Sequence, residues 1–146
     1  FASYAVTPQK KFRFGVYMNQ EFFGLFVWPL LGTDWRLGSN DYLVALLPGS
    51  LTYEHRWNNH LYSGTAFRAL TNSFMLDNGN FVRVDDNQVS LYLDIYPVRH
   101  WCITLESGYG IARKLRTGVD SKSYLSVNDM GDGLFIRVNT SYRIRL

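Results

Sequence analysis

Histidine is the side chain of this chain best suited to chemistry near neutral pH, because an imidazole can act as a base or bind a metal. His55, His60 and His100 each lie beside a segment of turn composition. No serine lies at nucleophile spacing from them, and a shared metal would require two neighbouring hairpins to converge. We therefore expect local roles at turns for all three, and neither catalytic residues nor a cofactor or metal site.

Two short motifs resemble binding loops without their full pattern. Gly108-Tyr-Gly110 is not a nucleotide loop, since no helical pattern follows it. Small residues there are expected to leave room for Tyr92 or an arginine on one face of a sheet. The segment 129–132 lacks the ligand spacing of a calcium loop.

Charges of both signs form a stronger signal. They recur at alternate positions of otherwise apolar segments, and inside a small barrel such charges persist only when they are paired and hydrogen-bonded. Glu106 is expected to lie near Arg137 to Arg143. On the solvated side of a soluble sandwich, the alternative, the same ion pairs would contribute little. The residues assigned to the predicted lumen are Arg13, Glu21, Asp34, Arg36, Glu54, Arg56, Arg68, Asp94, Glu106, Arg137 and Arg143.

The elements that position these charges are predicted to be strands. Residues 134–146 alternate apolar and polar up to the carboxyl terminus, which is the period of two of a β-strand. Other segments alternate in the same way between stretches of turn composition, and none has helical periodicity. This organisation predicts one all-β domain over residues 1–146, an antiparallel up-and-down meander of about eight strands. The alternating segments are 12–19, 51–57, 61–68, 89–96 and 101–108, and the turns are 38–41, 57–60, 78–79 and 97–100.

Two segments are exceptions to this alternation of strands and turns. Pro48-Gly49 is either a bend within one long strand or the tip of a hairpin. Residues 118–131 are polar and without alternation, which predicts an exposed loop. In a barrel with a periplasmic carboxyl terminus, that loop would lie outside the cell and the 97–100 turn on the periplasmic side.

Large aromatic residues stand near the ends of the predicted strands. Trp35, Trp57, Trp101 and Tyr142 fall on the apolar faces close to turns or to the terminus. An indole ring favours the membrane interface, where its apolar body and its N–H group are both accommodated. The alternative is that they are core residues of a soluble sheet; their recurrence at strand ends favours a girdle of interface aromatics.

Composition excludes several classes of protein. The 146 residues are 47% hydrophobic and 18% charged, with a net charge of +3 and without the long apolar run of a membrane helix. The charge is too small and too dispersed to indicate nucleic-acid binding. Cys102, the single cysteine, excludes a disulfide framework and is expected to be a buried, inert thiol. The chain opens in what looks like the middle of a strand, so its amino-terminal part is expected to be incomplete.

Several of these motifs carry a resemblance to a known family. Residues 29–37, 46–49, 51–54, 105–113 and 142–144 resemble an uncharacterised family of predicted outer-membrane β-barrel proteins of Gram-negative bacteria. The resemblance implies a barrel fold and an outer-membrane location, and it attaches no activity. Members of the family are longer, which implies that this chain is the carboxyl-terminal part of a larger barrel.

The sequence therefore predicts a non-catalytic transmembrane β-barrel, either a structural or interaction component or a small porin-like channel. Its expected partners are outer-membrane lipid and other outer-membrane proteins, with small solutes only if the barrel is wider than eight strands. The alternative is a soluble β-barrel or sandwich that binds an apolar ligand inside, like a lipocalin. Periodicity alone does not distinguish which face is the inner one.

Overall fold

The chain forms a single antiparallel sheet. The computed structural model describes residues 2–22, 24–76, 79–120 and 123–143, and these contain strands and turns only. The prediction of an all-β up-and-down meander is confirmed. The strands are β1 (Ala2–Thr7), β2 (Lys10–Glu21), β3 (Gly24–Arg36), β4 (Asp41–Leu47), β5 (Ser50–Arg56), β6 (Leu61–Met75), β7 (Phe81–Val98), β8 (Trp101–Asp120), β9 (Ser123–Asp129) and β10 (Gly133–Tyr142).

Each strand from β1 to β8 pairs with its sequence neighbour, and the last two strands share one partner. Trp101–Gly110 of β8 pairs with β10, and Lys114–Asp120 of β8 pairs with β9. Strands β9 and β10 therefore follow one another along the same strand, and the sheet is nine positions wide. Among the described residues, β1 and β10 are the two edges and do not pair, so backbone hydrogen bonds do not close the sheet into the predicted barrel.

Ten strands form where about eight were expected, because one open assignment is settled as a hairpin, the first residues form a full strand and one predicted loop is a strand. Pro48-Gly49 is the tip of the β4–β5 hairpin, and residues 2–7 form a strand of their own. The predicted loop over residues 118–131 is wrong. There β8 continues to Asp120 and β9 pairs back along it, so backbone pairing forms a hairpin. The alternation of Leu125 and Val127 with Ser126 and Asn128 is short and stands among turn-forming residues.

Two predicted features fall partly outside the described residues. The terminal strand predicted over 134–146 begins at Gly133 and is a strand to Tyr142, and residues 144–146 lie outside the described part. The turn predicted at 78–79 is described only at Gly79, whose φ of 79° suits glycine.

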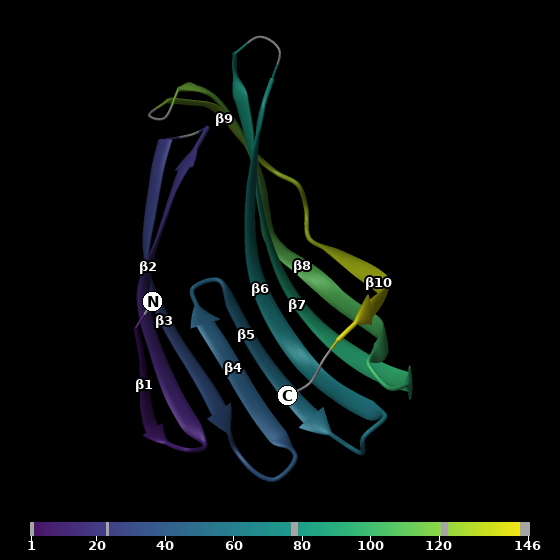
Figure 1. The fold of residues 1–146 in the computed structure, drawn as a ribbon. Coiled ribbons are helices and arrows are strands. Elements are labelled where there is room, and N and C mark those ends of the chain that lie inside the picture. Colours follow the sequence, from purple (N-terminus) through teal and green to yellow (C-terminus); the bar gives the residue numbers. More distant parts are fainter. Residues whose placement is uncertain (1, 23, 77–78, 121–122, 144–146) are drawn as a thin grey trace.

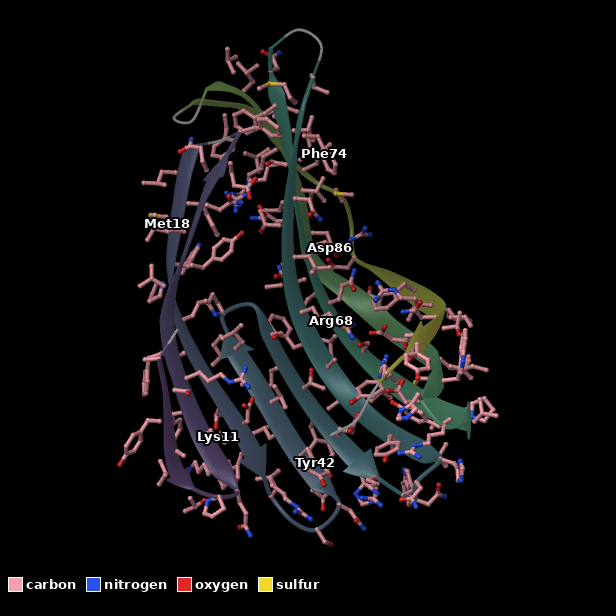
Figure 2. All side chains as sticks on the ribbon, in the orientation of Figure 1. Lys11, Met18, Tyr42, Arg68, Phe74 and Asp86 are labelled. Carbon is pink, nitrogen blue, oxygen red and sulfur yellow. The ribbon has the colours of Figure 1, made fainter. Side chains whose placement is uncertain are left out.

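The two faces of the sheet differ in chemistry, as the alternation predicts. We call them the charged face, which contains Arg68 and Glu106, and the apolar face, which contains Met18 and Leu91. The sheet is strongly curved (Figure 1), and Met18 on β2 points away from the rest of the sheet (Figure 2). Met18 is 68% exposed and Ile136 on the same face is 83% exposed.

Most of the buried residues gather on the charged face. Cross-strand pairing aligns them: Tyr62 lies opposite Asp94, Ala66 lies opposite Ser90, and Glu106 lies opposite the half-buried Tyr92. The fully buried side chains there include Asp94 and Cys102, the latter as predicted. Side chains therefore pack against one another on the inner side of the curve, while large apolar side chains remain exposed on the other side.

One hairpin is much shorter than its neighbours. Strands β4 and β5 have seven residues each, and in Figure 1 their hairpin ends well before the tips of β2–β3 and β6–β7. Residues 24–30 of β3 consequently pair only with β2, and residues 70–75 of β6 only with β7. Pro29 lies in this singly paired part of β3. Proline has no N–H group, and on the side of β3 away from β2 there is no strand that would need one.

Candidate functional site

The candidate site is the set of ionisable side chains on the charged face. Strand register places all eleven residues assigned to the predicted lumen on this one face, because directly paired residues, and every second residue along each strand, point to the same side of the sheet. They do not form one continuous network. Two buried carboxylates each form ion pairs with their own arginines, and the remaining residues make local contacts.

Glu106 is the centre of the first group. Its side chain is 4% exposed and lies on β8 between arginines from β6 and β10. Oε1 accepts hydrogen bonds from Arg68 Nη1 and from Ser90 Oγ, the latter at 2.6 Å, and Oε2 accepts one from Arg137 Nη1 at 3.0 Å. Arg137 also donates to Gln88 Oε1 at 3.2 Å. Two guanidinium groups thus neutralise one carboxylate, which is the arrangement a buried charge requires.

Asp94 is the centre of the second group. It is 1% exposed and lies on β7. Its Oδ2 accepts from Arg143 Nη1 at 2.5 Å, and its Oδ1 accepts from Thr104 Oγ1 at 2.5 Å. Arg143 Nη2 contacts the same threonine hydroxyl at 3.1 Å, so three side chains from β7, β8 and the end of β10 form a closed triangle. This triangle ties the last strand to the sheet.

The other predicted residues make contacts at the margins of the face. Arg13 pairs with Asp34 across β2 and β3. Tyr92 donates to Glu54 Oε2 at 3.3 Å. The guanidiniums of Arg36 and Arg56 bond to turn residues next to their own strands, and Glu21 bonds to Asn19 and Ser73.

A third group of charges escaped the sequence analysis. Arg113 Nε donates to Asp86 Oδ1 at 3.0 Å, and Arg83 and Arg116 both pair with Asp85. The β7–β8 register shifts between residues 85 and 87, so the adjacent Asp85 and Asp86 form ion pairs with different arginines. The only signal in the sequence was the Asp-Asp pair itself, which interrupts the alternation of β7.

Glycines on the charged face make room for large neighbours. A Cβ atom at Gly64 would lie 2.7 Å from Tyr92 Cζ, and one at Gly108 would lie 2.6 Å from Phe135 Cζ. At Gly110 the nearest atom would be Arg113 Cδ at 2.7 Å. The expected space for a tyrosine or an arginine is present, although Tyr92 fills the space at Gly64 and not the space beside Gly108.

The histidines make local contacts at the end of the sheet that carries the β1–β2, β3–β4, β5–β6 and β7–β8 turns, here called the aromatic end. His55 Nδ1 lies 2.7 Å from Asp41 Oδ1. His60 Nδ1 and His100 Nδ1 lie 2.9 Å and 3.2 Å from main-chain carbonyl oxygens, so each of these nitrogens carries its proton. Within the described residues, no group of three or more potential ligands is placed to hold a metal.

The four predicted interface aromatics lie on the apolar face at the aromatic end. Trp57 Nε1 donates to Ser63 Oγ at 2.8 Å, and the Trp101 and Tyr142 rings pack edge to face with centroids 6.3 Å apart. Lys10 Nζ lies 4.0 Å from the centroid of the Trp35 ring, within cation–π range. An exposed aromatic row with adjacent polar groups therefore marks this end.

In the described part of the chain, no helix has the length and apolarity needed to cross a membrane. Comparisons with protein-family models, with curated proteins and with solved structures gave no match. The fold and the charged face therefore define an antiparallel sheet protein with an ion-paired concave side and an exposed apolar side.

Proposed function

We propose that this chain is an integral outer-membrane protein of the β-barrel class, as the family resemblance also implies. It has no catalytic role and serves as a structural or interaction component, or as a narrow channel. The observation that carries the proposal is the inverted distribution of side chains. Carboxylates such as Glu106 and Asp94 are buried and paired, whereas large apolar side chains are exposed on the opposite face.

Lipid is the environment in which this distribution is favourable. A contiguous exposed apolar face is rare on a soluble monomer, and a lipid-facing strand alternates apolar outward with polar inward. A soluble lipocalin-like protein would instead bury apolar side chains on its concave side. The row of aromatics at one end of the apolar face suits the headgroup region of a bilayer.

The first test is fractionation of cells of a Gram-negative host that express the protein. We expect it to sediment with the outer membrane and to require detergent for extraction. We also expect unheated samples to migrate differently on gels from boiled ones, because a hydrogen-bonded sheet in detergent resists unfolding. Recovery as a monodisperse protein in buffer without detergent would refute the proposal.

The second test concerns orientation and uses Leu76, just after β6, and Val98, the last residue of β7, which lie at opposite ends of the sheet. In a Cys102→Ser background, a cysteine is introduced either for Leu76 or for Val98, both exposed. A membrane-impermeant thiol reagent on intact cells should label the protein at 76 and leave it unlabelled at 98, where the periplasm is expected. Lysed cells provide the control, since both sites should then react. Labelling at 98 alone on intact cells would show that the orientation is the opposite of the one expected.

A further inference from the structure

A cavity of about 580 Å³ lies on the charged face at the aromatic end, and it is here called the basic cavity. It is formed by the β5–β6 turn, the β7–β8 turn and the residue that follows β10, and the two turns lie side by side in Figure 1. Its size is typical of small-ligand sites. Of the described residues that line it, four are basic, His60, Arg99, His100 and Arg143, and none is acidic.

The two histidines hold the walls of the basic cavity in place. The Tyr96 N–H donates to the His60 carbonyl at 2.8 Å, and His60 Nδ1 donates back to the Tyr96 carbonyl at 2.9 Å. His100 and Arg143 repeat this exchange at 2.7 Å and 3.2 Å. Each turn is therefore fixed to the end of the neighbouring strand. A ligand that enters such an ordered cavity loses little binding energy to rearrangement of its walls.

The arginines at this end differ from those in the rest of the sheet. Over residues 2–22, 24–76, 79–120 and 123–143, every arginine forms an ion pair with a carboxylate except Arg36, Arg56 and Arg99. All three lie next to or within turns at the aromatic end. Arg36 and Arg56 donate to main-chain and amide oxygens, which are uncharged, and Arg99 is exposed on the β7–β8 turn. Unmatched positive charge is therefore confined to this end.

The charge balance at the basic cavity itself is positive. Arg99 and Arg143 line it, and Arg56 lies beside it, because its guanidinium donates to a lining asparagine. Two carboxylates of the charged face lie near these groups. Asp94 is 1% exposed and pairs with Arg143, and Glu54 stands two residues before Arg56 on β5. When each carboxylate is counted against its neighbouring arginine, Arg99 is left without a counter-charge among the described residues.

We propose that the basic cavity binds a phosphate monoester, carried either by a small water-soluble solute or by a lipid. A phosphate monoester has a charge of about −1.5 to −2 at neutral pH and three acceptor oxygens, and a guanidinium binds such an oxygen pair through two parallel hydrogen bonds. The buried rings of Tyr62 and Tyr96, with centroids 5.5 Å apart, also line the cavity and offer the ester part an apolar contact. The inference goes beyond the proposed function and does not need the membrane, since the cavity lies on the charged face.

The test is a titration of glycerol phosphate with the full chain, purified in an uncharged detergent and followed by phosphorus NMR. We expect a saturable change in chemical shift. Loss of a charge-assisted hydrogen bond in Arg99→Gln should weaken binding by about tenfold or more. Arg36→Gln is the matched control, because Arg36 also lacks a carboxylate partner at this end but does not line the cavity. Its affinity should equal that of the wild type.

The source of the phosphate is tested with dioleoylphosphatidic acid in mixed micelles and the same readout. Saturable binding of glycerol phosphate supports a solute. Binding of the lipid alone, again weakened only in Arg99→Gln, supports a lipid headgroup in the same site. No saturable binding of either probe, or an equal loss in Arg99→Gln and Arg36→Gln, would overturn the proposal. Equal competition by glycerate, a carboxylate with one negative charge, would overturn the assignment to a phosphate. A protein that proves soluble is titrated in buffer, so the two proposals fail separately.

Discussion

Replacing Glu106 by alanine should lower the free energy of unfolding by about 3 kcal/mol, because the substitution leaves Arg68 and Arg137 facing one another without their shared counter-charge. The value lies at the low end for a broken buried pair because both arginines are partly exposed. A denaturant series in detergent measures the change.

The control for this prediction is the preceding residue. Leu105 lies on the same strand and the opposite face, and it is 42% exposed. If that face contacts lipid or detergent, Leu105→Ala leaves no cavity in a packed core, and the expected loss is below about 1 kcal/mol. A larger loss for Leu105→Ala than for Glu106→Ala would mean that the inner and outer faces have been exchanged. Glu106→Gln should fall between the two, since an amide still accepts hydrogen bonds.

Alanine at Gly64 should be the most damaging conservative substitution in the sheet. Its Cβ would lie 2.1 Å from the main-chain oxygen of Tyr53 and 2.6 Å from Tyr92 Oη. The tyrosine side chain can move, but the carbonyl belongs to the paired strand β5. Relieving the clash therefore requires a backbone shift, which costs about 2 kcal/mol or more.

Gly133 provides the matched comparison, because a Cβ there would meet nothing within 4 Å. Gly133→Ala should leave the unfolding midpoint unchanged or slightly raised. Gly64→Ala should lower it, or prevent formation of the fast-migrating species on unheated gels. Tyr92→Ala in the Gly64→Ala background should restore little, since the carbonyl contact remains. Full recovery in that double variant would show that the ring, and not the strand backbone, sets the limit.

The two faces of the sheet were predictable because a strand has a period of two that in-register pairing preserves. Glu106 and Arg137 each stand at alternate positions with other polar residues of their own strands, which places each on the polar side, and the order of the strands places them close together. The grouping of the charges was not predictable to the same degree. A long arginine reaches diagonally or past a neighbouring strand, as Arg68 does from β6 to Glu106 on β8, so several pairings satisfy the same pattern.

Features that depend on strand length were missed for a different reason. In β9, Leu125 and Val127 alternate with Ser126 and Asn128, but this run is short and lies among turn-forming residues, so the segment was assigned to a loop. The singly paired parts of β3 and β6 beyond the β4–β5 hairpin follow from the residue at which each strand stops. Pro29 gave a local indication of this arrangement, since a proline within a strand suggests an open side.

The consecutive placement of β9 and β10 along β8 fixes the direction of the sheet's last edge. Across nine positions with alternating direction, the first and last strands run the same way. β1 and β10 are thus unable to join as antiparallel neighbours, and a seamless antiparallel ring requires an odd number of strands from outside the described residues. A single strand donated by another polypeptide would satisfy both edges at once, which makes the parity of the sheet a constraint on any assembly that this protein enters.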